Sequence, residues 1–211
     1  IGDDDQVADC ISKIGISSRF LLSLINDVLD MSKIESGKLS ISHEPFNLRS
    51  SIQNINNLIR PQAQARQLDF DIFLTGVDEE ELCGDSLRLN QILLNILSNA
   101  LKFTPRGGSI RLEIMQLAKK RNTIRLRFII SDTGIGMSED FLQRLYQPFE
   151  QASASTAARY GGTGLGMPIT SNLVSLMGGV ISVRSREGEG TTFAVELPFG
   201  LSERAAEKHD S

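Results

Sequence analysis

The stretch from Asp85 to Thr104 constrains the fold of this chain more than any other. Asp85 or Ser86 can cap the N-terminus of a helix. The apolar residues that follow recur at spacings of three and four, which predicts a helix with a broad apolar stripe. The residues of this stripe are Leu87, Ile92, Leu93, Ile96, Leu97, Ala100 and Leu101.

Asn95, Asn99 and Lys102 interrupt this apolar helix along one edge. Their spacing of i, i+4 and i+7 places all three side chains on a single face. Burial of two carboxamides and an ammonium without partners would be costly. A carboxamide oxygen is a ligand for Mg²⁺ and an ammonium neutralises phosphate, so the face suits a magnesium-bound phosphate chain. From these residues alone, a polar face that simply meets water is an equal alternative.

Composition narrows the class of protein. A chain of 211 residues can hold one large domain or a domain with an appendage, and its 40% hydrophobic content supports a core. No apolar run approaches the ~20 residues that span a membrane. The net charge of −4 argues against nonspecific nucleic-acid binding. Cys10 and Cys83 lack metal-ligand or redox spacing, which indicates ordinary reduced thiols of a cytosolic domain.

The chain begins at Ile1 without a methionine or a signal-like segment. We therefore expect a part excised from a longer protein, whose sensor or membrane anchor lies elsewhere. Residues 201–211 are charged and are expected to fray.

The N-terminal segment carries a heptad seam, formed by Val7, Ile11, Ile14, Ser18, Leu21, Ile25 and Val28. It predicts a helix over about 6–36 with a length of roughly 45 Å, which ends at Gly37. Such a seam needs a partner helix, either from a preceding segment or from a second subunit. The alternative is that the helix packs on its own domain.

The remaining chain alternates strand and helix patterns. The predicted elements are an extended segment at 38–41, a helix at 47–65 capped by Asn47, a strand at 68–74, two strands at 109–117 and 123–131 joined by 118–122, a helix at 138–146, a mobile loop at 151–160, a helix at 166–177 with Pro168 in its first turn, and a closing hairpin of 180–186 and 191–197. Two hairpins mixed with helices predict an α+β sandwich with a mixed sheet and not a doubly wound sheet.

The first glycine motif runs from Asp132 to Gly136, after a strand and before a helix. A dinucleotide-binding fingerprint would need a third glycine, but Glu139 stands there and Asp140 follows it. Two carboxylates in the first turn of that helix would repel a pyrophosphate. A carboxylate at a strand end can instead accept a hydrogen bond from an exocyclic amine, so Asp132 could read adenine.

The second glycine motif, Gly161 to Gly166, lies between the predicted loop and a helix N-terminus. Backbone amides without side chains can approach phosphates closely there, and the helix dipole assists. No Walker lysine follows the motif, which excludes a P-loop.

In this order and spacing, the motifs resemble the catalytic core of sensor histidine kinases, in the superfamily of gyrase, heat-shock chaperone and mismatch-repair ATPases. Five stretches carry the resemblance over nearly the whole chain: 91–104 is similar to the N box, 132–136 to the G1 box, 148–151 to the F box, 162–166 to the G2 box and 188–193 to the closing strand. Residues 22–39 resemble the second dimerisation helix, and the hybrid type with a receiver domain is the most similar.

The resemblance implies a fold and a division of the chain. We expect a two-layer α/β sandwich of the Bergerat type, with a mixed sheet, helices on one face and a long coiled-coil-like helix before it. Residues 1–38 would be the second helix of a dimerisation domain, 39–200 the ATP-binding domain and 201–211 a charged tail.

The resemblance also implies roles for single residues, with ATP and Mg²⁺ as ligands. Asn99 and Asn95 would hold the metal, and both would form the catalytic set together with Lys102 at the phosphates. The remaining implied contacts of the nucleotide are Asp132 at the adenine amine, Gly134 and Gly136 at the base pocket, Thr192 in its water network, Phe149 bracing the lid, Arg159 at the phosphates, and Gly162, Thr163, Gly164, Leu165 and Gly166 in the closing lid.

Two departures concern the chemistry. ATPase branches of the superfamily carry a glutamate base where Asn95 stands, so this site suits an external nucleophile better than water. The family's phosphoacceptor histidine lies in a box on the first dimerisation helix, whereas the two histidines here are His43 and His209. His43 is followed by Pro45 and Phe46 and is expected to be a surface or strand residue.

We therefore expect an enzyme that donates the γ-phosphate of ATP to a histidine outside this stretch. The alternative is a nucleotide-binding regulatory module without transfer, and a hydrolytic gyrase-like ATPase is disfavoured by Asn95. The implied partners are a histidine-bearing dimerisation helix, a receiver domain and a second copy through residues 7–32, without nucleic acid or membrane contact. The implied location is cytoplasmic, with any inner-membrane anchor elsewhere in the parent protein.

Overall fold

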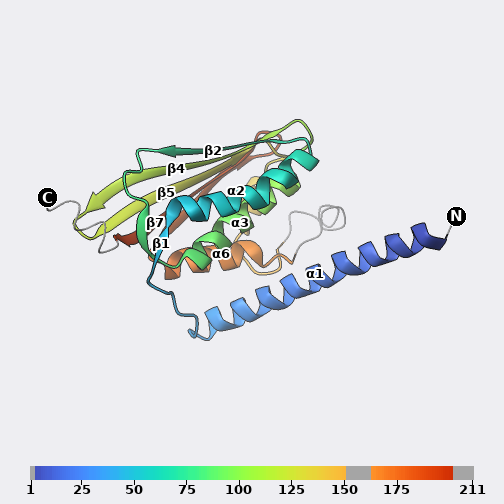
Figure 1. Cartoon of the computed structure of the whole chain (residues 1–211), viewed down its shortest axis with the longest axis horizontal. Helices are drawn as coiled ribbons and strands as arrows, with labels where there is room; N and C mark the ends of the chain where they lie inside the picture. The colour runs from blue at the N-terminus through green and yellow to red at the C-terminus, as the bar shows by residue number, and fades with distance from the viewer. Residues whose placement is uncertain (1–2, 151–162, 202–211) are drawn as a thin grey trace.

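The structure is a computed structural model that describes residues 3–150 and 163–201. A seven-stranded mixed sheet carries helices α2, α3 and α6 on one face, and helix α1 projects as a long rod from the domain (Figure 1). This arrangement confirms the predicted α+β sandwich with helices on one face.

Helix α1 spans Asp3–Glu35, close to the predicted range of 6–36. Its apolar seam is exposed, with Ile11 and Ile14 at 64% and 65% exposure. At the other end of the helix, Met31 and Ile34 pack against the core of the domain. The last turns thus pack on the chain's own domain, whereas the seam remains without cover among the described residues, and its pairing with a partner helix stays a prediction.

Helices α2, Leu48–Ala65, and α3, Ser86–Phe103, begin where their caps predicted. The Asn47 side chain accepts a hydrogen bond from the Ser50 backbone N–H at 2.8 Å. Asp85 accepts from Arg88 N at 2.9 Å and, with its other oxygen, from Ser42 N at 3.0 Å. Asp85 thus starts α3 and also fixes the segment that leaves α1.

The sheet has the order β1-β3-β7-β5-β4-β2, and β6 also pairs with β7. Its strands are β1 Glu44–Asn47, β2 Asp69–Thr75, β3 Glu81–Gly84, β4 Ser109–Lys120, β5 Thr123–Asp132, β6 Val180–Arg186 and β7 Gly190–Leu201. Strands β2 and β4 are parallel, and all other pairs are antiparallel.

Several strand predictions need correction. The extended segment lies at β1 and not at 38–41, and Pro45 is tolerated because β1 is an edge strand. Strand β3 was not predicted, since four residues are too short to show a period. The β4–β5 turn is only residues 121–122, and a bulge between Gln116 and Ala118 absorbs the extra length. The hairpin of β6 and β7 does not close the sheet, because β7 lies inside it, between β5 and β3.

In the described part of the chain, two further helices each follow one of the glycine motifs. Helix α4, Glu139–Leu142, is capped by Ser138 as predicted but ends four residues before Tyr146. The chain turns there towards Pro148, and a helix cannot easily continue up to a proline. Helix α6, Gly166–Leu176, carries Pro168 in its first turn as predicted.

The core lies between the sheet and the three helices that cover it. Leu93 on α3, Phe128 on β5 and Val195 on β7 are fully buried there. No helix in the described part of the chain combines the length and the apolar character needed to cross a membrane.

Candidate functional site

The polar edge of α3 faces the beginning of α6. The Asn95 Nδ2 group donates to the Gly166 carbonyl at 3.3 Å and to Thr170 Oγ1 at 3.2 Å. A methyl group on Gly166 would lie 3.8 Å from Asn95 Cγ. Asn99 lies one turn further along α3 and is half-buried. The amide group of Asn95 therefore lies close to Gly166, the last glycine of the second glycine motif.

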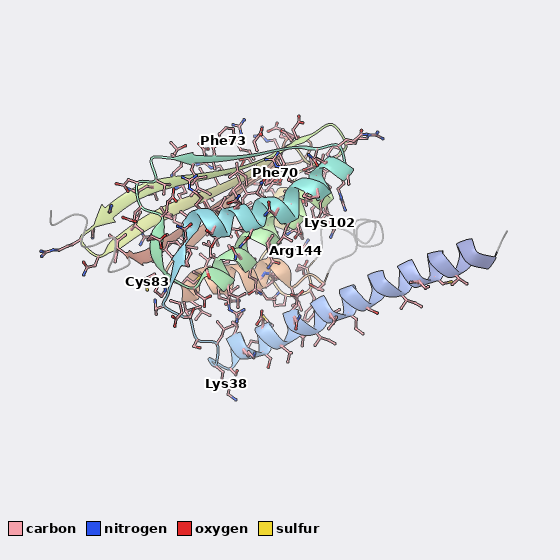
Figure 2. All side chains as sticks on the ribbon, in the orientation of Figure 1. Lys38, Phe70, Phe73, Cys83, Lys102 and Arg144 are labelled. Atoms are coloured by element: carbon pink, nitrogen blue, oxygen red, sulfur yellow. The ribbon has the colours of Figure 1, made fainter. Side chains whose placement is uncertain are left out.

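Lys102 is in the last turn of α3, near the C-terminal end of α2 (Figure 2). Its ammonium lies 4.7 Å from the centre of the Phe103 ring, a cation–π distance. Burial lowers the pKa of Lys102, because the surrounding protein penalises the charged form. An anion placed nearby would stabilise this charge.

Asp132 is the last residue of β5. Burial raises the pKa of its carboxyl, while hydrogen bonds from the backbone N–H groups of Gly134 and Thr191 act in the opposite direction. The Gly134 bond measures 2.8 Å to Oδ1. The structure therefore holds a half-buried acceptor at the strand end, where the sequence predicts a reader of the adenine amine.

Gly134 and Gly136 allow three elements to meet beside Asp132. A Cβ on Gly134 would lie 2.6 Å from Asp132 Oδ1 and 2.8 Å from the Phe103 carbonyl oxygen. A Cβ on Gly136 would lie 1.9 Å from the Arg186 carbonyl oxygen, and its φ of +67° also favours glycine. The loop after β5 is thus pressed against the end of α3 and the end of β6.

A backbone contact between Phe149 and Gly164 joins the segment similar to the F box to the second glycine motif. The Phe149 backbone N–H donates to the Gly164 carbonyl at 3.0 Å. Both residues have positive φ, 65° for Phe149 and 71° for Gly164, and a Cβ on Gly164 would lie 2.8 Å from Phe149 Cα. The Phe149 side chain is 71% exposed, so its backbone and not its ring makes this contact.

The segment before α6 is organised by Thr163. Its Oγ1 accepts from Leu165 N at 3.1 Å and donates to the Asp27 carboxylate of α1 at 3.0 Å. Leu165 itself is buried, and no side chain caps the N-terminus of α6. The first amides of α6 are therefore available to an anion in the way the sequence predicts.

The structure does not bring Thr192 to the face of the sheet on which the helices pack, so its contact with the base stays a prediction. Side chains alternate along β7, and Thr191 and Phe193 point into the buried layer. Thr192 lies on the other face, where its hydroxyl bonds that of Ser131 at 3.0 Å. The residue beside Asp132 is Thr191, and the apolar Phe193 two positions later is the signal that could have set this register.

Sequence reasoning also missed two neighbours of the site. The Phe103 carbonyl accepts from Ile135 N at 3.1 Å, and its ring lies under Lys102. Ser185 accepts from Met137 N at 2.9 Å and bonds the Thr191 hydroxyl at the same distance. An aromatic residue directly after the polar face was a usable signal for Phe103, whereas Ser185 has none.

Five predictions concern other places. Arg159, Gly162 and the loop at 151–160 lie outside the described residues, as does His209. His43 is exposed directly before β1, as expected of a surface residue, and its carbonyl accepts from Cys83 Sγ.

A pocket of about 370 Å³ lies at the C-terminal ends of α2 and α3. Of the predicted site residues it includes Lys102, and its lining is Ala65, Arg66, Gln67, Lys102, Thr104 and Arg106. The negative ends of the α2 and α3 dipoles point into this pocket. They favour the cationic side chains of Arg66, Lys102 and Arg106 there, so the pocket does not require an anionic ligand to explain them. Arg66 in fact donates to the Leu101 carbonyl at 2.9 Å. Asn95 and Asp132 do not line this pocket.

The comparisons with known proteins come from sequence and from structure. Residues 84–201 match the family model of the histidine kinase-, DNA gyrase B-, and HSP90-like ATPase. Over 200 residues the chain is 39% identical to the sensory/regulatory protein RpfC of Xanthomonas campestris, covering 95% of this chain and 28% of RpfC. It is 43% identical over 189 residues to the sensor histidine kinase GacS of Pseudomonas protegens, covering 90% and 20%.

A third relative is the autoinducer 2 sensor kinase/phosphatase LuxQ of Vibrio parahaemolyticus, 42% identical over 197 residues, with 92% of this chain and 23% of LuxQ covered. The chain thus spans 28% or less of these three relatives. Among solved structures, ShkA in complex with AMPPNP superposes with a TM-score of 0.76 at 30% identity, covering 92% of this chain and 39% of ShkA. The Acinetobacter baumannii histidine kinase AdeS shares the fold, with a TM-score of 0.67 at 18% identity and coverage of 93% and 85%.

Proposed function

The chain belongs to the histidine kinase-, DNA gyrase B- and HSP90-like ATPase family as an ATP-binding catalytic core of the histidine kinase type, and we propose that it transfers the γ-phosphate of ATP to a histidine outside residues 1–211. The observation that carries this proposal is the identity and environment of Asn95. A carboxamide cannot take a proton from water, and both hydrogen bonds of its Nδ2 hold it against α6. A site without a base for water favours a nucleophile that is brought to it.

The nucleotide contacts follow from the arrangement of the segments similar to the N, G1, F and G2 boxes. Asp132 accepts a hydrogen bond from the adenine amine, and Gly134 and Gly136 keep the base pocket open beside it. The backbone amides of Gly164 to Gly166 face the phosphates at the N-terminus of α6. Phe149 braces this segment through its bond to Gly164. Gly162, Thr163 and Arg159 would belong to the same lid.

A Mg²⁺ ion fits the donor set on α3. Among the described residues no group of three His, Cys, Asp or Glu side chains could hold a metal, and the oxygen donors on this edge of α3 are the amides of Asn95 and Asn99. Asn99, with Asn95 beside it, would supply them, and phosphate oxygens and water would complete the six positions that Mg²⁺ prefers. When bound, the ion neutralises charge on the phosphates. Lys102 contributes further positive charge, and its pKa, lowered by burial, would rise beside them.

The chain's part in transfer is to position ATP and to exclude hydrolysis. In-line attack by an imidazole nitrogen forms the new P–N bond while the bond to the ADP oxygen breaks, so ADP leaves with the electron pair. The acceptor would come from a dimerisation domain whose second helix is residues 1–38, followed by the ATP-binding domain at 39–200 and the tail at 201–211. A second copy would pair through residues 7–32, and a response regulator receiver domain would take the phosphoryl group. The chain itself would act in the cytoplasm.

The test is calorimetric titration of the chain with Mg²⁺ and a non-hydrolysable ATP analogue. We expect Asn99→Ala to weaken binding by at least about tenfold, because metal ligands contribute this much. Asn57→Ala on the exposed face of α2 is the matched control and should bind like the unchanged chain.

Transfer is then measured with ATP and a histidine-bearing dimerisation domain in trans. The expected product is acid-labile phosphohistidine that forms faster than free phosphate. Faster release of phosphate would favour a hydrolytic ATPase. Binding without either product would favour the regulatory module, and no binding at all would refute the assigned site.

A further inference from the structure

The end of α1 is fixed to the ATP-binding domain by a polar cluster on α3. The Asp30 carboxylate accepts from Arg88 Nη1 at 3.2 Å and from Gln91 Nε2 at 2.8 Å. The Arg88 and Asp30 side chains are only 17% and 16% exposed. A half-buried, charge-assisted cluster of this kind holds a definite geometry. The position of α1 relative to the nucleotide site is therefore specified by side chains.

Asp27, one turn earlier on α1, contacts the nucleotide site itself. Its Oδ2 accepts the Thr163 hydroxyl proton at 3.0 Å, and the same hydroxyl accepts from Leu165 N at 3.1 Å. Leu165 directly precedes the first residue of α6. A continuous chain of hydrogen bonds thus joins α1 to the glycine-rich segment.

The electrostatic setting of Asp27 differs from that of Asp30. Asp30 has Arg88 as its counterion, whereas the structure pairs Asp27 with a neutral hydroxyl. Burial raises the pKa of Asp27, the Thr163 hydrogen bond opposes this, and the charge of Asp30 adds to it. The N-terminus of α6, which no side chain caps, attracts negative charge. The positive end of α6 therefore stabilises the charge of the Asp27 carboxylate, and a phosphate would bind in the same region.

The Asp27 carboxylate reaches the start of α6 through the Thr163 hydroxyl, which itself accepts from the Leu165 amide. A triphosphate at the start of α6 would repel a carboxylate at Thr163, since charges a few ångströms apart interact strongly when partly buried. We propose that Asp27 competes with the nucleotide phosphates for the glycine-rich segment, so that docking of α1 and binding of ATP oppose each other. This coupling rests on the proposed function, because it assumes phosphates at α6.

The coupling is reciprocal by thermodynamic linkage. If α1 docking through Asp27 weakens nucleotide binding by some factor, nucleotide binding weakens that docking by the same factor. A rotation or bend of α1 would thus change ATP affinity, and ATP would release the end of α1. Asp27 acts here as a positioning residue, through Thr163.

The test uses Asp27→Asn, which removes the charge and keeps the shape and a hydrogen-bonding oxygen. We expect the Mg²⁺–ATP analogue to bind about fivefold tighter, at the lower end of measured couplings. Glu35→Gln is the control, because Glu35 is an exposed acid on the same helix and its loss changes the net charge equally. It should leave affinity unchanged. The unfolding midpoints of all three chains verify that they are folded.

A second readout follows α1 directly. We expect the nucleotide to speed amide hydrogen exchange at residues 27–35 in the unchanged chain and to have no such effect in Asp27→Asn. Equal affinities for Asp27→Asn and the unchanged chain, or a gain that Glu35→Gln reproduces, would overturn the competition while leaving the nucleotide site intact. Absence of binding by the unchanged chain would instead overturn the proposed function.

Discussion

At the scale of single residues, Asp132 combines a structural and a chemical role. Two backbone N–H groups hold its carboxylate at the end of β5, although burial raises its pKa. Retaining a half-buried acid costs stability unless a hydrogen-bonding partner compensates for the lost water. A donor such as an exocyclic amine recovers this cost by pairing with the free electron pairs of the carboxylate.

We predict that Asp132 makes the site prefer ATP to inosine triphosphate, which carries a carbonyl in place of the amine. The carboxylate repels that carbonyl, and an unpaired buried acceptor typically weakens binding by ~1–3 kcal/mol. In Asp132→Asn the preference should fall, because an amide can rotate to donate to the carbonyl. Titration with both nucleotides measures the ratio.

The matched control for this pair is Asp69→Asn, an exposed acid at the start of β2. It should keep the ratio of the unchanged chain. An Asp132→Asn chain with the same ratio would mean that another group reads the base.

At the scale of elements, the site depends on a close crossing of two turns. The loop after β5 and the β6–β7 turn meet where the Gly188 N–H donates to the Ile135 carbonyl at 2.8 Å. Gly136 touches the Arg186 backbone at the same crossing. The two turns are therefore joined by a hydrogen bond and by close backbone contact.

The pair Gly136 and Gly188 separates backbone strain from close contact. Both have positive φ, +67° and +79°, but a Cβ on Gly188 meets nothing within 4 Å. We predict that Gly188→Ala lowers the free energy of unfolding by about 1 kcal/mol, the usual cost of alanine at such a backbone conformation. Gly136→Ala should cost about 2 kcal/mol more, because the crossing must open.

Denaturant unfolding of the two variants checks this prediction. Nucleotide affinity should also fall in Gly136→Ala and remain in Gly188→Ala. Equal losses of stability would show that conformation alone requires these glycines.

At the scale of the whole molecule, α1 is the described element that exposes the most large apolar side chains. Its seam includes Leu21, which is 57% exposed, and Leu22 beside the seam is 60% exposed. A long row of apolar side chains at heptad spacing favours pairing with another helix. Only the last turns of α1 find cover in the described domain, through Met31 and Ile34.

We predict concentration-dependent self-association of the chain through this seam, measured by sedimentation velocity. Ile14→Glu places a charge in the seam and should shift the chain towards monomer. Asn26→Glu adds the same charge at an exposed position beside the seam and should not. Association that survives Ile14→Glu would place the contact elsewhere.

The local signals in the sequence determined most elements of this protein. Asn47, Asp85 and Ser138 predicted three helix starts correctly, because a capping side chain bonds amides only three residues away. The apolar stripe of α3 and the alternation in β4 and β5 likewise depend on neighbours in sequence. The order of the motifs then indicated the family.

Tertiary structure decided what depends on partners distant in sequence. The short strands β1 and β3 exist only because each pairs with a neighbour in the sheet. Which threonine lies beside Asp132 follows from the face of β7 that the helices cover, and a shift of one residue reverses it. The contact between Asp27 and Thr163 joins residues 136 positions apart, and no local pattern could predict it. Helix capping and apolar periodicity depend on residues close in sequence. Strand pairing, the face of a strand that is buried and the docking of α1 depend on the packing of the whole domain.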